Sequence, residues 1–284
     1  MTATALYEQI LRKQSFLCVG LDSDRRQLPA CLSDDAEPLW AFNKAIVDAT
    51  AAYAVAYKPN TAFYEVAGAA GWQQLEKTVR YIRRQHPDIF IIADAKRGDI
   101  GNTSQRYAEA FFDTLDVDAV TLSPYMGRDT IQPFLEYPGK WAVLLALTSN
   151  ASSTDFETLT VDGGSTVYET VLQKSKEWGT VDNTMYVVGA TQAALLAAIR
   201  KIVPQHFLLV PGVGAQGGSL EEVACYGMND RCGLLVNISR DILFADSSGG
   251  FAAAAAAKAQ EWQEKMALLM GNGESASRLS IQNP

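Results

Sequence analysis

The sequence has few of the residues that build metal centres or disulfide frameworks. It has four cysteines and two histidines in 284 residues, and no two cysteines form a C-x-x-C pair. His86 and His206 lie far apart in the chain. This scarcity argues against a structural zinc site and against a disulfide-stabilised secreted domain. We therefore expect reduced thiols, no metal ligands and a cytoplasmic protein.

Long apolar runs and an excess of positive charge are also missing. No stretch approaches the roughly 20 apolar residues that a membrane helix needs, and the first segment, MTATALYEQILRKQ, lacks the apolar core of a signal peptide. Lys and Arg number 24 against 32 Asp and Glu, so the net charge is −8. Nucleic acids and anionic membranes bind basic surfaces, so we expect neither as a partner. A few well-placed cations are still enough to bind a small anion.

What the sequence does have is a regular alternation of short apolar runs with helical patterns. The runs are rich in β-branched residues and end in polar, Gly or Pro residues, as buried parallel strands do. Eight of them begin at Phe16, Tyr53, Ile89, Asp118, Trp141, Met185, His206 and Gly233. This rhythm predicts an α/β fold, a (β/α)8 TIM barrel. A doubly wound open sheet is the alternative, but the G-x-G-x-x-G fingerprint is missing after the first run, which ends in Gly20-Leu21-Asp22.

The barrel is expected to form a single domain over residues 1–270. The polar segment 271–284, GNGESASRLSIQNP, is expected to be a disordered C-terminal tail. The longest connection, residues 149–182, contains Gly163 and Gly164 before a helical pattern. Because long loops after barrel strands often cover the active face, we expect a lid in this connection.

The densest group of charges follows the third apolar run, in IIADAKRGDIGNTSQRY. Asp94 and Lys96 are two residues apart and so share one face of a strand, and Asp99 follows in the next turn. The second run also ends in a cation, Lys58. Burying a charged group costs several kcal/mol unless it is paired. An internal salt bridge is the structural alternative, but four alternating charges at one end of a barrel are more than a bridge requires and indicate a catalytic network.

A phosphate site is indicated after the last two apolar runs. The segment VPGVGAQGGSLEEV places several glycines between a strand and a helix, where backbone N–H groups can approach an anion. Arg240 follows the eighth run in VNISRDI and can bind a phosphate with two N–H groups. Phosphates usually bind at the loops after strands seven and eight of this fold. A pair of ordinary tight turns is the alternative.

Taken together, these segments resemble the orotidine 5′-phosphate decarboxylase family. DAKRGDIGNTS is similar to the family signature D-x-K-x-x-D-I, and LDSD, YKPN, PGVGAQGG and NISR follow in the family's order, from about Phe16 to Phe244. The length and the segment PYMGRD resemble the longer bacterial branch. The resemblance implies decarboxylation of orotidine 5′-monophosphate to uridine 5′-monophosphate and carbon dioxide, the last step of de novo pyrimidine nucleotide synthesis. It implies no cofactor, and the sequence shows no nucleotide fingerprint or histidine cluster that would indicate one.

The resemblance also implies a role for each matching charged residue. Lys96 matches the lysine that delivers a proton to C6 of the pyrimidine, and Asp94 matches the aspartate beside the scissile carboxylate. Lys58 matches the lysine that bridges the charge network and the ribose. Asp99 and Thr103 match residues that enter the neighbouring subunit's site. The protein is therefore expected to be a homodimer with shared active sites.

The remaining matches concern substrate binding. Asp22 matches a ribose-binding aspartate after the first strand. Ser149 matches a serine that contacts the pyrimidine edge, although LTSN departs from the motif of the shorter branch. Gln216 and Arg240 match the residues that grip the phosphate, and Ser239, beside Arg240 in NISR, is counted with the substrate-binding residues.

Three other functions remain as alternatives. Magnesium-dependent relatives on the same barrel, the 3-keto-gulonate phosphate decarboxylases and hexulose phosphate synthases, have an acidic residue where Lys58 stands. A Schiff-base aldolase needs a lysine with a lowered pKa, which neighbouring aspartates do not provide. A non-enzymatic phosphoribosyl-binding barrel would have no use for four alternating charges at its strand ends.

Overall fold

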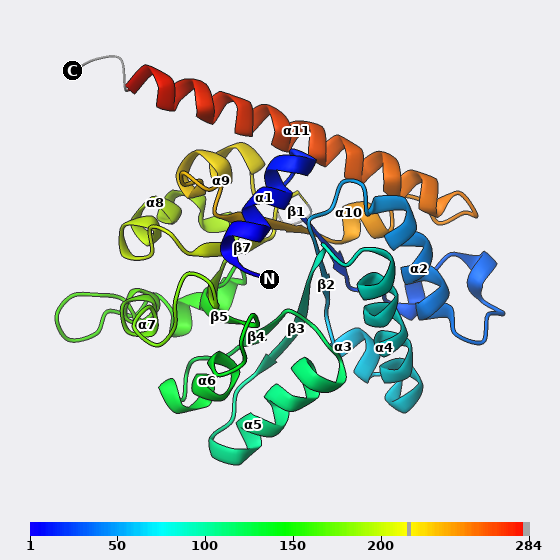
Figure 1. Ribbon diagram of the computed structural model, residues 1–284, viewed down its shortest axis with the longest axis horizontal. Coiled ribbons are helices and arrows are strands. Elements are labelled where there is room, and N and C mark those ends of the chain that lie inside the picture. The colour runs from blue at the N-terminus through cyan, green and yellow to red at the C-terminus, as the bar shows by residue number, and fades with distance from the viewer. Residues whose placement is uncertain (215–216, 281–284) are drawn as a thin grey trace.

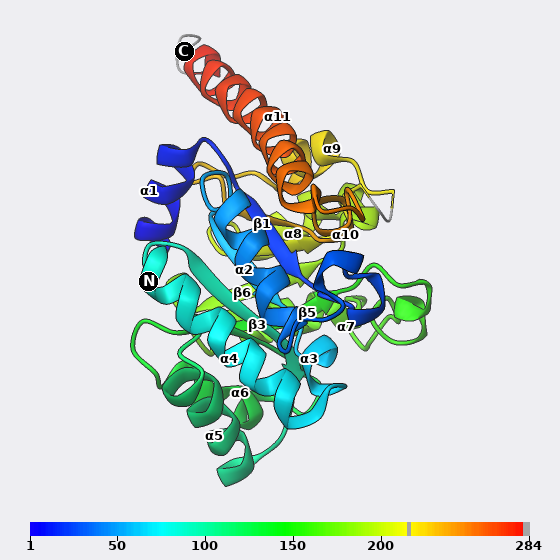
Figure 2. The same ribbon diagram turned by 90° about the vertical axis from the view of Figure 1, so that its right-hand side faces the viewer.

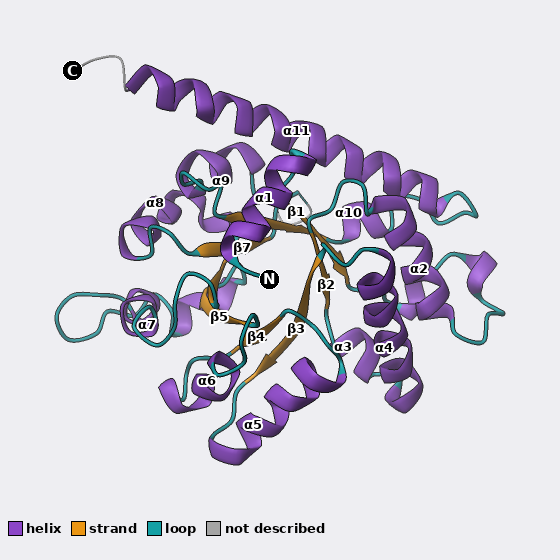
Figure 3. Cartoon of the chain, in the orientation of Figure 1, coloured by secondary structure: helices purple, strands orange, loops and turns teal. Residues whose placement is uncertain are grey.

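The predicted apolar runs form eight parallel strands that close into a barrel, which confirms the TIM-barrel prediction. The computed structural model describes residues 1–214 and 217–280, without the side chains of Gln192 and of residues 272–280. Each strand pairs with the next one along the chain, and the eighth pairs with the first, as the ring of arrows in Figure 3 shows. The strands are β1 Leu17–Leu21, β2 Ala56–Pro59, β3 Phe90–Arg97, β4 Ala119–Leu122, β5 Trp141–Leu147, β6 Thr184–Val188, β7 Phe207–Pro211 and β8 Leu234–Ile238.

Helices cover the outside of this barrel (Figure 1). They are α1 Ala3–Lys13, α2 Pro38–Thr50, α3 Ala62–Glu65, α4 Gly68–Gln85, α5 Gly101–Glu109, α6 Arg128–Leu135, α7 Val167–Ser175, α8 Ala193–Ile202, α9 Leu220–Gly227, α10 Arg240–Leu243 and α11 Phe251–Ser280. Every residue of β1, β4, β6 and β8 is buried, because helices cover one face and the barrel interior covers the other. Among the described residues, no helix has the length and apolar character that crossing a membrane requires.

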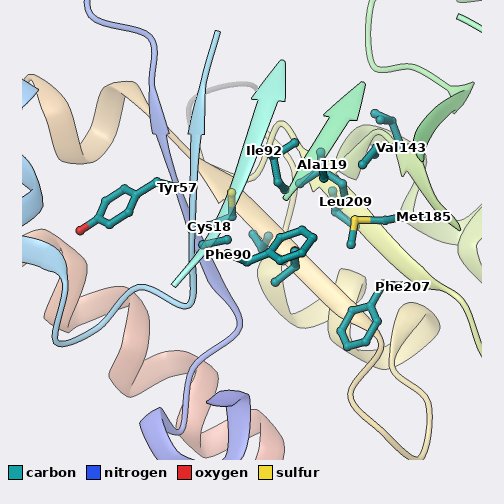
Figure 4. Packing of buried hydrophobic residues seen from close by; sticks show 14 of the residues in the cluster. Cys18, Tyr57, Phe90, Ile92, Ala119, Val143, Met185, Phe207 and Leu209 are labelled. Carbon is teal, nitrogen blue, oxygen red and sulfur yellow. The ribbon is translucent and has the colours of Figure 1, made fainter. Parts of the chain in front are cut away.

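The side chains of the strands alternate between the barrel interior and the helices. Figure 4 shows Phe90, Met185 and Leu209 pointing toward one another, whereas Tyr57 points away from them. The hydroxyl of Tyr57 reaches α2, where it donates to the backbone oxygen of Val47 at 3.1 Å. The same alternation gives Asp94 the inward direction of Phe90, four residues before it on β3.

The first helix, α1, lies across the amino-terminal opening of the barrel (Figure 1). The backbone oxygen of Met1 accepts a hydrogen bond from Nε1 of Trp141, at the start of β5, at 2.7 Å. The backbone N–H of Ala3 donates to Asp182 Oδ1 before β6 at 2.8 Å, and the Lys13 ammonium donates to the backbone oxygen of Ala54 before β2 at 2.7 Å. Because α1 closes this end, the opposite end of the barrel is the open one.

The last helix, α11, is longer than the sequence predicts. Its first residue, Phe251, stacks on Phe42 of α2 with ring centres 5.3 Å apart, and its far part extends away from the barrel (Figure 2). The helix continues past Gly271 to Ser280, so the backbone of the predicted tail is helical that far. Residues 271–280 contain no proline and several good helix formers, which allows the helix to continue. Residues 281–284 lie outside the described residues, and the division into a 1–270 domain and a tail stays a prediction.

A buried histidine lies at the amino-terminal side of β7. His206 packs against Tyr186 with ring centres 5.5 Å apart, and neither ring nitrogen has a hydrogen-bond partner among the described residues. Burial, together with the nearby cations Arg200 and Lys176, lowers the pKa of His206 to about 4. The folded protein therefore binds this proton much more weakly than the unfolded chain, in which the pKa of histidine is about 6.5.

We expect this histidine to destabilise the fold in acid. The stability is complete above the unfolded pKa of about 6.5 and falls as the pH is lowered toward 4, because only the unfolded chain binds the proton readily. Between pH 8 and pH 5, the free energy of unfolding of the wild type should fall by ~2 kcal/mol more than that of His206→Phe. Urea unfolding of both proteins at the two pH values measures this difference. Equal losses of unfolding free energy in the two proteins would contradict the lowered pKa of His206 in the folded protein.

Candidate active site

The charged side chains predicted at strand ends lie at the carboxyl-terminal opening of the barrel. Lys58 belongs to β2, Asp94 and Lys96 belong to β3, and Asp22 directly follows β1. A cavity of about 450 Å³ opens here. Its lining comprises Lys58, Asp94, Lys96, Thr121, Leu145, Thr148, Ser149, Asn150, Val187, Thr191, Leu209 and Pro211. The cavity thus lies where barrel enzymes hold their substrates.

Asp94 is held between two lysines. The Lys58 ammonium lies 2.8 Å from Asp94 Oδ2, and the Lys96 ammonium lies 2.6 Å from Asp94 Oδ1. On the other side of Lys58, Asp22 Oδ1 lies 3.8 Å from the ammonium. The side chains of Lys58 and Asp94 are 5% and 10% exposed, whereas that of Lys96 is 50% exposed. Lys96 is therefore the most exposed member of this network, and all three side chains line the cavity.

In this network, the neighbouring opposite charges affect the pKa values of Lys58 and Asp94 more than burial does. Burial by itself would lower the pKa of Lys58, but the carboxylates of Asp22 and Asp94 raise it above its usual value. Burial would likewise raise the pKa of Asp94, but Lys58 and Lys96 hold it well below its usual range. Lys58 and Asp94 are therefore both charged at neutral pH, in a region that water reaches poorly.

The pairing of β3 with β4 is interrupted at Lys96, and the backbone of this residue has an unusual conformation. The register shifts between Ala93 and Arg97, and Lys96 has a left-handed backbone conformation with φ of 48°. A residue with a Cβ pays about 1–2 kcal/mol in that conformation, so its surroundings must hold it there. Thr121 of β4 supplies such a contact, because its hydroxyl accepts the backbone N–H of Lys96 at 3.0 Å. The same hydroxyl donates to Asp94 Oδ1 at 2.9 Å.

The rim of the cavity after β5 is fixed by a carboxylate from further along the chain. Glu157 Oε2 accepts the backbone N–H of Thr148 at 2.7 Å, and Glu157 Oε1 accepts the Thr148 hydroxyl at 2.8 Å. Gly189, after β6, packs directly on the next residue, Ser149. A Cβ at Gly189 would lie 2.7 Å from the Cβ of Ser149, so only glycine fits without a shift. Thr148 and Ser149 both line the cavity. Glu157 therefore fixes the first of these residues, and Gly189 packs against the second.

The connection predicted to contain a lid is only partly irregular. It holds a single 3-10 turn over Ala151–Asp155, an antiparallel bridge between Thr160 and Thr166, and then α7. The side chains of Phe156 and Leu159 are 71% and 51% exposed in the stretch before α7. This stretch starts at the cavity rim, and its role as a lid stays a prediction.

Two predicted residues lie outside the network in the single chain. Asp99 follows β3, and its Oδ1 accepts the backbone N–H of Ile100 at 2.8 Å. Thr103 is exposed in the first turns of α5. Among the described residues, no ion pair joins Asp99 to Lys96.

The predicted phosphate residues are less well gathered than the charge network. Arg240 is exposed at the start of α10 and lines a second hollow of about 440 Å³, together with Asp241, Phe244, Ala245 and Lys258. The hydroxyl of Ser239 accepts a hydrogen bond from Asn237 Nδ2 at 3.3 Å. Gln216 lies outside the described residues. Gly214, two residues before it, has a φ of 73°, a left-handed backbone conformation that favours glycine.

The polar residues that support the network and the cavity rim were not predicted from the sequence. Thr121 and Thr148 are polar residues within or directly after an apolar run. That position is the available signal, because a polar group at a buried strand needs a partner. Glu157 gave no signal, because only the folded connection brings it back to Thr148. Among the described residues, no group of three or more His, Cys, Asp or Glu side chains is placed to hold a metal ion.

The sequence is similar to a family of known proteins. Residues 15–256 match the family described as orotidine 5′-phosphate decarboxylase / HUMPS. The chain is 61% identical to the orotidine 5′-phosphate decarboxylase of Bacteroides fragilis over 267 residues, which are 94% of this chain and 97% of that protein. It is 58% identical to the protein of the same name from Porphyromonas gingivalis over 270 residues, 95% of this chain and 98% of that protein.

Solved structures agree with these sequence matches. The OMP decarboxylase of Leishmania donovani superposes with a TM-score of 0.80 at 36% identity, covering 94% of this chain and 100% of that one. The orotidine 5′-monophosphate decarboxylase of Methanocaldococcus jannaschii superposes with a TM-score of 0.62 at 18% identity, over 86% of this chain and 96% of that one, and shows the shared fold alone. The chain belongs to the orotidine 5′-phosphate decarboxylase / HUMPS family.

Proposed function

We infer that the chain decarboxylates orotidine 5′-monophosphate to uridine 5′-monophosphate and carbon dioxide, a step of pyrimidine nucleotide synthesis. The observation that carries the inference is the Lys58–Asp94–Lys96 network beside the cavity. Relatives that share more than half of their residues with the chain bear the name of this activity. The magnesium-dependent relatives would need an acidic residue at position 58, where this chain has a lysine.

Lys96 is the proton donor in this proposal. The bond between C6 of the pyrimidine and its carboxylate breaks, and the electron pair stays on C6 as carbon dioxide leaves. The resulting carbanion lies in the ring plane, where no adjacent carbonyl delocalises it. The proton of the Lys96 ammonium passes to C6 and gives uridine 5′-monophosphate. The neutral amine then takes a proton from water for the next turnover.

Asp94 and Lys58 prepare Lys96 for this step. Asp94 holds the Lys96 ammonium at 2.6 Å, and Lys58 holds Asp94 at 2.8 Å on its other oxygen. Two unit charges about 4 Å apart interact by ~4 kcal/mol at an effective dielectric constant of about 20. Because the ammonium is already oriented when the carbanion forms, little reorganisation accompanies the reaction.

Substrate binding is assigned to the remaining residues that match the family. The Asp22 side chain is 22% exposed, and its Oδ1 lies 3.8 Å from the Lys58 ammonium, so the exposed part of the carboxylate can accept a ribose hydroxyl. Ser149 lines the cavity and is assigned to the pyrimidine edge. Gln216 and Arg240 are assigned to the phosphate, at the loops where this fold usually binds one. Ser239, next to Arg240, is assigned to substrate binding.

A homodimer would complete the site. Asp99 and Thr103 lie beside a group of exposed apolar side chains on the connections that follow β2, β3 and β4. This group consists of Val66, Ile100, Tyr125 and Met126, which are 85%, 54%, 90% and 48% exposed. Large exposed apolar side chains on neighbouring connections are often found at protein interfaces. We assign it to the contact through which Asp99 and Thr103 reach the partner's Lys96 and ribose.

The four cysteines are free thiols, Cys18 and Cys232 buried and Cys31 and Cys225 exposed. Burial raises the pKa of both Cys18 and Cys232 to about 12, so these two thiols stay protonated and unreactive. Free thiols support the expected cytoplasmic location, which stays a prediction.

The first experiment tests Lys96 and the absence of a metal requirement together. Lys96→Ala should lower kcat by roughly 1000-fold, within the range that a positioned acid contributes. Lys44→Ala is the control, because Lys44 pairs with Asp48 on the exposed face of α2. The absorbance of orotidine 5′-monophosphate reports turnover, with and without EDTA. Loss of wild-type activity in EDTA and its return with magnesium would favour the metal-dependent relatives instead.

The second experiment tests the shared site. Lys96→Ala and Asp99→Ala should each be inactive alone, because every site of either homodimer carries a defect. Unfolding and refolding the two together should restore about one quarter of the wild-type activity, because half of the dimers then hold one intact site. Failure to regain activity, although sedimentation shows that mixed dimers have formed, would contradict the proposal that Asp99 acts across the interface.

A further inference from the structure

We propose that Thr121 is a positioning residue for the decarboxylation, and that its single hydroxyl fixes both ends of Lys96. The proposal rests on the assignment of Lys96 as the proton donor. It adds a residue from a neighbouring strand to the set that prepares this lysine.

The first contact holds the backbone of Lys96. The pairing of β3 with β4 is regular as far as Ala93 and Val120, and it resumes at Arg97 and Leu122. Between these points the strands are out of register, so the N–H of Lys96 takes a side-chain oxygen, Thr121 Oγ1, at 3.0 Å. This contact occurs where Lys96 has its φ of 48°. A left-handed residue that is not glycine persists only where its surroundings over-determine it.

The second contact holds the side-chain end of Lys96 through Asp94. A hydroxyl has one hydrogen, and because an N–H can only donate, Thr121 must accept from Lys96 and donate elsewhere. Its hydrogen goes to Asp94 Oδ1 at 2.9 Å. That same oxygen accepts the Lys96 ammonium at 2.6 Å. Thr121, Asp94 and Lys96 therefore form a closed ring of hydrogen bonds.

The two hydrogen bonds in this ring fix the orientation of the Thr121 hydroxyl. Thr121 is 1% exposed, so water cannot take the place of either partner. Asp94 Oδ2 is held separately by Lys58 at 2.8 Å, which fixes the plane of the carboxylate. In this ring the hydroxyl sets which way Oδ1 faces, and Oδ1 sets where the ammonium points. A lysine side chain has several rotatable bonds, so this restraint decides how often the ammonium faces C6.

The threonine methyl and hydroxyl can be tested separately by two matched pairs of variants. Thr121→Val keeps the shape of the side chain and removes the hydroxyl. Thr121→Ser and Thr121→Ala form a second pair that differs only in the hydroxyl, and this pair decides the question if the valine variant does not fold. The measurements are kcat and KM for orotidine 5′-monophosphate, the Kd of uridine 5′-monophosphate and the thermal midpoint, with wild type and Lys96→Ala alongside.

We expect a loss in kcat that follows the hydroxyl. Thr121→Val should lower kcat by roughly 10-fold to 100-fold, the range expected for a hydrogen bond to a charged group. Thr121→Ala should fall below Thr121→Ser by a similar factor, and Thr121→Ser should stay near wild type. The Kd of uridine 5′-monophosphate should change less than about threefold among wild type and the three Thr121 variants, because the lost contact acts on proton delivery.

Three results would overturn the proposal. A valine variant with wild-type kcat would show that the hydroxyl does not position Lys96. A valine or alanine variant that loses kcat and product affinity in equal measure would show a role in shaping the cavity. A serine variant as slow as the alanine variant would show that the methyl group, and not the hydroxyl, is what matters. Activity retained by Lys96→Ala would instead contradict the assignment of the proton donor.

Discussion

One carboxylate holds two ammonium groups at the mouth of the barrel, and the charge network of the site depends on it. Asp94 accepts Lys58 through one oxygen and Lys96 through the other, at 2.8 Å and 2.6 Å. Without that charge, the buried Lys58 would be an unpaired cation, which costs several kcal/mol. Lys96, half exposed at the cavity, would lose the contact that directs its ammonium. The two lysines in turn lower the pKa of Asp94 and so keep it ionised.

The barrel makes this arrangement possible by separating its two ends. α1 closes the amino-terminal opening through contacts to the starts of β5 and β6, and apolar side chains fill the interior behind the network. The charges can therefore gather at the carboxyl ends of β2 and β3, between the apolar interior and an open cavity. The chain has a net charge of −8, and a nucleotide substrate is itself an anion. Local cations at the site, not the total charge, decide whether such a substrate binds.

The sequence allows the fold and the core of the network to be predicted, for a simple reason. Parallel strands end at one edge of a barrel, and residues two apart share a face, so Asp94, Lys96 and Lys58 must meet. The support of Thr121 could not be foreseen in detail, because it depends on a register shift that no residue pattern announces. Asp99 lies outside the network in one chain, and only a resemblance assigns it to a partner. The helical backbone as far as Ser280 was missed because composition alone suggested a tail.

The most direct test of the central interaction is the kcat of Asp94→Asn, measured below the unfolding temperature of the variant. The amide keeps the shape of the carboxylate but removes the charge that orients both lysines. Breaking a buried ion pair in this way should lower kcat by roughly 100-fold or more, while uridine 5′-monophosphate still binds. A folded Asp94→Asn variant that decarboxylates orotidine 5′-monophosphate at the wild-type rate would contradict the role of the Lys58–Asp94–Lys96 network in orienting the proton donor.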